Sequence, residues 1–125
     1  MQLEQRIVHY ALAEWGAYEE SQLDKSFYAK ITPLYRYMME GRPGKPVFSS
    51  TILSFGTPQT VLNVKKAIDK LPEQQKTIVA AQYIFHIKPT GGLWTTREKA
   101  ERLGFTYSNW QTNLHRARER LYSWL

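Results

Sequence analysis

The residues between Tyr107 and Arg116 carry side chains that can read the edges of DNA bases. Asparagine and glutamine pair with adenine, arginine pairs with guanine, and threonine contacts the methyl group of thymine. We predict that Asn109, Thr112 and Arg116 read bases, while Arg97 and Lys99 hold phosphates. The full set of predicted DNA contacts is Thr96, Arg97, Lys99, Tyr107, Ser108, Asn109, Gln111, Thr112, His115 and Arg116.

Other chemistries find no support in the sequence. The chain has no cysteine, which excludes disulfides, thiol catalysis and cysteine-ligated zinc. The three histidines, His9, His86 and His115, are far apart, and no carboxylate pair has the spacing of metal ligands. Gly91-Gly92 lacks the lysine and hydroxyl residue that complete a phosphate-binding loop. We therefore expect no metal, no other cofactor and no enzymatic activity.

The charge of the chain is unevenly distributed. The formal net charge is +6, from 17 Lys and Arg against 11 Asp and Glu, and the first forty residues are net acidic while the remainder is basic. A polyanion would be attracted to the C-terminal two-thirds. An ordinary solvated surface is the alternative interpretation of the same charges.

A pair of helices must position the predicted DNA contacts. Thr95 or Thr96 is placed to cap a short first helix, with Glu98 or Lys99 near the capping-box position. Ala100 and Leu103 would face inward in this helix. We expect the charged residues Arg97, Lys99, Glu101 and Arg102 to stay in water.

The second helix of the pair is predicted to run from about Ser108, its N-cap, to the C-terminus. Gly104 permits the left-handed backbone of a tight exit from the first helix, and Phe105 would fill the gap between the two. An inward stripe recurs at steps of four, three and four residues: Trp110, Leu114, Ala117 and Leu121. A plain helical hairpin with a solvated polar face is the alternative to a DNA-reading helix-turn-helix.

The rest of the chain is also predicted to be helical, which gives an all-α fold class: a small helical domain with a C-terminal helix-turn-helix. Helices are expected over residues 3–18 and, as one helix or two short ones interrupted at Pro33, over 26–39. Two more are expected from Thr57, the predicted cap, and Pro58 to Leu71, and from Pro72 to about 87. The expected stripe of the first helix is Leu3, Ile7, Tyr10, Ala11, Trp15 and Tyr18.

Three parts are expected along the chain: an N-terminal helical part over 1–40, a Pro/Gly-rich loop over 41–56, and the DNA-binding part over 57–125. The N-terminus has no signal-peptide core, and no apolar run approaches the roughly 20 residues of a membrane span. We therefore expect an intracellular protein without a membrane partner.

Part of the chain resembles region 4 of bacterial sigma factors. The resemblance spans residues 68–121 and is carried by Leu71–Gln75 at the start of a helix, by Ala100–Gly104, and by Leu114–Leu121. This chain departs from the module by the long segment from Lys88 to Trp94. The resemblance implies a sigma region 4-like helix-turn-helix.

Nearly the whole chain resembles the lambdoid-phage antitermination protein Q family. Leu12–Tyr18 is similar to the "ERWGAW" opening of that family, and Ile31–Tyr37 falls where the family has an aromatic "LLPY"-like segment. Val64–Ile68 and Ile78–Ile84 correspond to its basic and apolar helices. Some Q proteins carry zinc-binding cysteines, which this chain lacks.

The Q resemblance implies a phage transcription antitermination factor in the host bacterial cytoplasm. Such a protein binds a DNA element at a late promoter, loads onto host RNA polymerase paused nearby, and makes the enzyme read through terminators. The flap and sigma region of the polymerase would be its partners. Separately, the Pro/Gly-rich loop could place Arg42 and Lys45 against the polymerase or along nucleic acid, and a solvated loop is the alternative interpretation.

Two further functions stay open. One is a helix-turn-helix repressor or activator that acts only at an operator. The other is a sigma-like initiation subunit, which is disfavoured because nothing here resembles the promoter-melting region. A repressor would dimerise on a palindrome. The chain shows no obvious dimerisation helix beyond the first, which favours loading as a monomer.

Overall fold

The computed structural model describes residues 3–25, 33–40, 48 and 56–125. These residues form α1 (Leu3–Lys25), α3 (Pro33–Glu40), α4 (Gln59–Ile68), α5 (Glu73–Ile84), α6 (Thr96–Arg102) and α7 (Tyr107–Trp124). The described ranges contain no strand, only an isolated antiparallel bridge between Ile87 and Leu93. The predicted all-α class is therefore confirmed for this part of the chain. No described helix is both long and apolar enough to cross a membrane.

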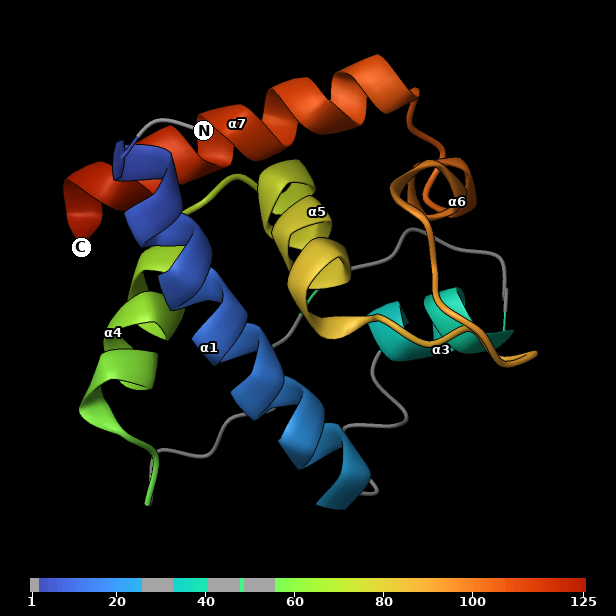
Figure 1. Cartoon of the computed structure of the whole chain (residues 1–125), viewed down its shortest axis with the longest axis horizontal. Coiled ribbons are helices and arrows are strands. Elements are labelled where there is room, and N and C mark those ends of the chain that lie inside the picture. Colours follow the sequence, from blue (N-terminus) through green and yellow to red (C-terminus); the bar gives the residue numbers. More distant parts are fainter. Residues whose placement is uncertain (1–2, 26–32, 41–47, 49–55) are drawn as a thin grey trace.

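Helix α5 lies in the middle of the molecule, with α1, α6 and α7 packed around it (Figure 1). Four consecutive residues, Ile78 to Ala81, are fully buried. A helix that is apolar on all sides is stable only inside a core, which explains its central place. Helix α1 also packs against α4 and α7, so the N-terminal and C-terminal helices share one hydrophobic core.

The buried face of α1 differs from the predicted one. Leu3, Ile7 and Tyr10 were expected in the core but are exposed. The buried stripe is Val8, Leu12, Trp15 and Glu19, which again follows steps of four, three and four residues, so the prediction is confirmed for Trp15. Both stripes satisfy the helical period, so periodicity alone could not separate them.

Gly16 is the closest point between α1 and α5. A Cβ atom at this position would lie 2.2 Å from the carbonyl oxygen of Tyr83, far inside van der Waals contact. Glycine therefore lets the two backbones touch. The helix continues through Gly16 to Lys25, beyond the predicted end at residue 18.

Three prolines stand at the beginnings of helices. Pro33 is the first residue of α3, and residues 26–32 of the predicted helical region lie outside the described residues. Pro58 and Pro72 immediately precede α4 and α5 without a side-chain cap, so Thr57 is not the predicted cap of α4. Arg42 and Lys45, the predicted polymerase contacts, lie outside the described residues, as does most of the 41–56 loop.

We expect Gly16→Ala to lower the free energy of unfolding by about 1–3 kcal/mol, because the added methyl group forces α1 away from α5. In a free helix the same change would stabilise by about 1 kcal/mol. Urea unfolding measures the difference, and Ala17→Gly, at an exposed position of α1, is the control for helix propensity. A more stable Gly16→Ala protein would contradict the close approach.

Candidate nucleic-acid interface

A tight turn joins α6 to α7. Gly104 has a φ of 79°, in the left-handed region that favours glycine. The N–H of Phe105 donates to the carbonyl oxygen of Ala100 at 2.8 Å, and the N–H of Gly104 donates to that of Glu101 at 3.1 Å. These two bonds make a Schellman motif, which satisfies the last carbonyl groups of α6. The predicted role of Gly104 is confirmed.

Side-chain caps fix where both helices begin. Thr95 caps α6 in a reciprocal capping box with Glu98, as one of the predicted alternatives had it. Helix α7 begins one residue after Thr106, whose hydroxyl oxygen accepts from the N–H of Asn109 at 3.1 Å. The predicted N-cap, Ser108, therefore lies within the first turn instead.

The inward side of α7 matches the prediction. Trp110, Leu114, Ala117 and Leu121 are all buried. Phe105 packs against this core, with its ring edge-on to Trp110 at a centroid distance of 6.1 Å. Helix α6 is seen nearly end-on in Figure 1 while α7 is seen lengthwise, so the axes of the two helices are not aligned with each other.

The outward side of α7 brings most predicted contacts onto one exposed surface. Its exposed members are Tyr107, Ser108, Asn109, Gln111, Thr112, His115 and Arg116. We call this surface, together with exposed Arg97 of α6, the α7 polar face. Thr96, at the start of α6, is half-buried.

Three local contacts order the α7 polar face. The guanidinium of Arg97 lies 4.4 Å from the ring centroid of Tyr107, which links the first turns of α6 and α7. Asn113 donates from its amide to the side-chain oxygen of Asn109. His115 pairs with Glu119 one turn further along.

The prediction that Lys99 is exposed and contacts phosphate is wrong. Its side chain is only 4% exposed, and Nζ donates to the carbonyl oxygen of Gln82 at 3.3 Å. Burial lowers the pKa of Lys99 from 10.5 to about 8, an effect that the charge of Glu20 partly offsets. Lys99 therefore anchors α6 to α5 rather than facing solvent.

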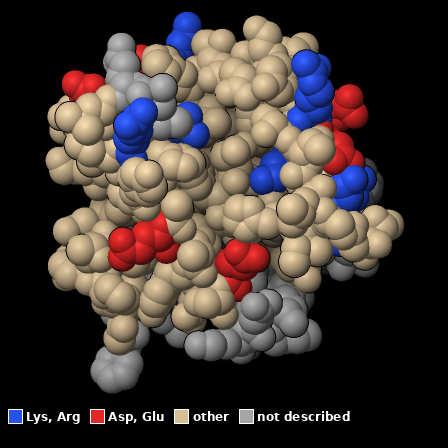
Figure 2. Space-filling view, in the orientation of Figure 1, with Lys and Arg blue, Asp and Glu red and all other residues tan. Residues whose placement is uncertain are grey.

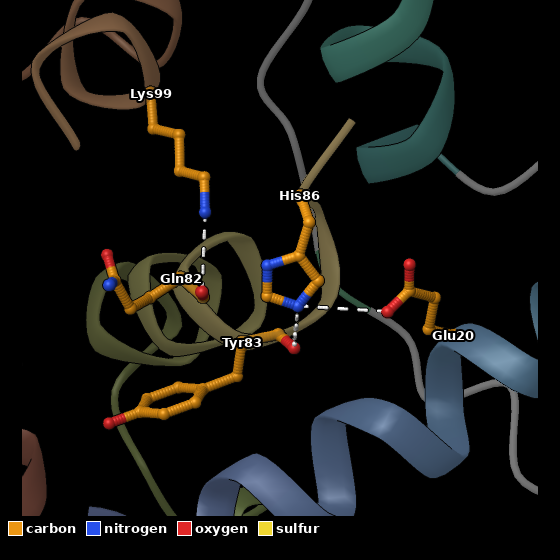
Figure 3. A network of polar contacts seen from close by, with 5 residues as sticks. All are labelled: Glu20, Gln82, Tyr83, His86 and Lys99. Carbon is orange, nitrogen blue, oxygen red and sulfur yellow. Dashed lines mark hydrogen bonds and ion pairs between the residues drawn. The ribbon is translucent and has the colours of Figure 1, made fainter. Parts of the chain in front are cut away.

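The last turn of α5 receives these anchoring contacts (Figure 3). Gln82 takes part in two of them. Its carbonyl oxygen accepts from Lys99 of α6, and its side-chain oxygen accepts from Nε1 of Trp110 in α7 at 3.3 Å. His86 donates from Nε2 to the carbonyl oxygen of Tyr83 at 3.0 Å and lies 3.7 Å from Glu20. The terminal carbonyl groups of a helix have no partner within it, so side chains from elsewhere can bind them.

The hydroxyl of Tyr83 connects α5 with α1 and α7. It accepts from Arg118 at 2.7 Å and 3.1 Å and lies 2.9 Å from Nδ1 of His9. Burial, and then the charge of Arg118, lower the pKa of His9, so its Nδ1 is suited to accept a hydrogen bond that the Tyr83 hydroxyl donates. Burial raises the pKa of Tyr83, although Arg118 opposes this.

Two further arginines of α7 differ in exposure. Arg118 is half-buried against Tyr83, whereas Arg120 is exposed and donates to Gln75 at 3.4 Å. In Figure 2 the basic side chains lie mainly over the upper half of the face, where Figure 1 places α6 and α7, with acidic groups among them. Charge alone therefore does not outline the interface.

Sequence reasoning missed Gln82, Tyr83 and Asn113. A glutamine inside the apolar α5 pattern was the one available signal for Gln82, since buried polar groups require partners. The partners themselves come from distant segments and could not be identified. Within the described residues no three metal-ligating side chains lie together.

No protein-family profile, curated protein or solved structure matches this chain significantly. The resemblances to sigma region 4 and to the Q family therefore stay predictions. The α7 polar face and its anchoring contacts are the observations from which a function can be proposed.

We expect the free energy of unfolding to rise from pH 8 to pH 10.5 by roughly 2 kcal/mol because of Lys99. In this window the unfolded lysine holds a proton that the folded lysine has lost, so raising the pH favours folding. Lys99→Met should lack this rise, since methionine fills the same space without titrating. Urea unfolding of both proteins across the window isolates the effect, because other titrating groups are common to them. If the free energies of unfolding of the two proteins changed in parallel with pH, the burial of the Lys99 ammonium would be contradicted.

Proposed function

We propose that this chain binds double-stranded DNA through α6 and α7, which act as a helix-turn-helix with α7 in the major groove. The observation that carries the proposal is the two-sidedness of α7. Its inward stripe is fully packed, while its opposite side presents amide, hydroxyl and guanidinium groups at the N-terminal end. Groove-reading helices contact base edges with their N-terminal residues.

The side chains divide into two roles. Asn109, Thr112 and Arg116 read base edges, and Arg97 contacts phosphate from the start of α6. The Asn113 amide holds the Asn109 oxygen, which leaves the Asn109 NH₂ group free to donate to a base. Lys99 has no part in this interface because its ammonium is buried.

We propose further that the protein is a phage antitermination factor. From its late-promoter site it would load onto promoter-proximally paused host RNA polymerase, with sigma still associated, and make the enzyme read through terminators. The similarity of Leu12–Tyr18 to the opening of the Q family supports this. The packing of α1 against α7 adds a physical reason, since DNA bound to α7 would set the orientation of the N-terminal helix.

Arg97→Gln should weaken binding to all DNA sequences alike and reduce the salt dependence by about one phosphate contact, whereas Arg6→Gln, at an exposed position of α1, should leave both unchanged. The pair is matched because both changes replace an exposed guanidinium with the same neutral side chain. Fluorescence anisotropy over a salt series measures the two effects. Equal losses in the two variants would contradict the assigned roles.

Asn109→Ala and Arg116→Ala should each cost about 1–3 kcal/mol at a specific site and relax specificity. The site is first selected from a random duplex library with the unchanged protein, and each variant is then measured on that site and on a scrambled one. Ser123→Ala, at the exposed end of α7, is the control. Wild-type affinity and specificity in both variants would falsify the placement of α7 in the groove.

Purified transcription on a template with the selected site at a promoter and a terminator downstream tests antitermination. We expect the protein to raise readthrough, and Arg116→Ala to abolish this gain at concentrations where it no longer binds the site. Binding with baseline readthrough, and with changed initiation only, would instead support the repressor or activator.

A further inference from the structure

A groove of about 460 Å³ lies where α1, α4 and the end of α7 meet. Its apolar lining comes from all three elements: Ile7, Ala11, Val64, Ala67, Trp124 and Leu125. Lys66 of α4 and Lys70 of the turn after it also line the groove, and neither Asp nor Glu is among its described lining residues. The groove thus combines an apolar floor with a positive edge.

Three of the apolar side chains that line this groove are open to solvent. Ile7 is 49% exposed, Trp124 39% and Leu125 49%, and Leu3 lies one turn before Ile7 with 69% exposure. Single exposed apolar residues are common, but a group of them around a concave surface marks an interaction site. The misassigned stripe of α1 is part of this surface.

The two lysines make the groove selective for charge. Lys66 lies in the last turn of α4 and Lys70 in the turn that follows the helix, so two positive charges border the groove. Within the described residues neither is paired with a carboxylate, whereas neighbouring Lys65 contacts Asp69 at 3.2 Å. The ammonium of Lys70 lies 5.8 Å from the ring centroid of Trp124, at the apolar floor.

We propose that this groove binds an amphipathic segment of a partner protein, with apolar residues on one side and carboxylates beside them. The apolar residues would fill the groove between α1 and α4, as an amphipathic helix does in a hydrophobic groove. The carboxylates would pair with Lys66 and Lys70. A nucleic acid fits less well, because Trp124 is the one aromatic ring among the lining residues that the structure describes.

This inference goes beyond the proposed DNA binding and does not depend on it. The groove lies at the C-terminal end of α7, and the α7 polar face begins at its N-terminal end. An 18-residue helix is about 27 Å long, so a segment in the groove would leave the polar face accessible.

The test uses the full chain and a designed fluorescein-labelled helical peptide with a leucine face flanked by glutamates. Anisotropy titration up to millimolar peptide, with amide chemical-shift mapping, should show binding at α1, α4 and the end of α7. Lys66→Glu with Lys70→Glu should weaken this binding by about tenfold or more, and the double variant should bind a lysine-flanked peptide instead. Lys65→Gln, on the same helix, should bind as the unchanged protein does.

Ile7→Ser, at an exposed position, should also weaken binding of the glutamate-flanked peptide without changing the thermal unfolding midpoint. Three results would overturn the proposal. The first is the absence of shifts at the groove up to millimolar peptide. The second is a preference for a fluorescein-labelled single-stranded oligonucleotide that is lost in Trp124→Ser. The third is self-association in analytical ultracentrifugation that Ile7→Ser abolishes, because a second copy would then occupy the groove.

Discussion

The contact of two backbones at Gly16 sets the arrangement of the helices. Because α1 approaches the carbonyl group of Tyr83 so closely that no Cβ atom fits between them, the Tyr83 side chain is held at the junction of three helices. Its hydroxyl then meets His9 from α1 and Arg118 from α7. A glycine in one helix thereby determines where another helix, distant in sequence, is anchored.

The same turn of α5 positions the proposed DNA-binding helices. Gln82 binds Lys99 through its backbone and Trp110 through its side chain, so one residue of α5 contacts both α6 and α7. The C-terminal end of a helix carries partial negative charge, which favours cations such as Lys99 beside it. Burying an ammonium is nevertheless unfavourable, because the charged group loses its hydration, and this lowers the pKa of Lys99. In return, the contact fixes the position of α6 on the core.

Local signals in the sequence predicted local structure well. The capping box at Thr95, the turn at Gly104 and the buried stripe of α7 depend on residues within a few positions of one another. Features that depend on distant partners were not predictable. Lys99 looks like a solvated cation until Gln82 is placed beside it. Thr106 and Ser108 can both cap a helix, and the sequence does not say which begins α7.

Helix α1 shows why periodicity can mislead and what the error means. It carries two apolar stripes, one through Leu12 and Trp15 and another through Leu3 and Ile7. A helix that is apolar on two sides normally packs on both. In the described part of the chain only the first stripe is covered by the core, and the second borders the groove. Because the covered stripe packs against α5 and α7, a partner bound to the second would be held in a fixed orientation to the α7 polar face. Helix α1 is therefore the element through which DNA at one end of α7 and a protein at the other would be connected.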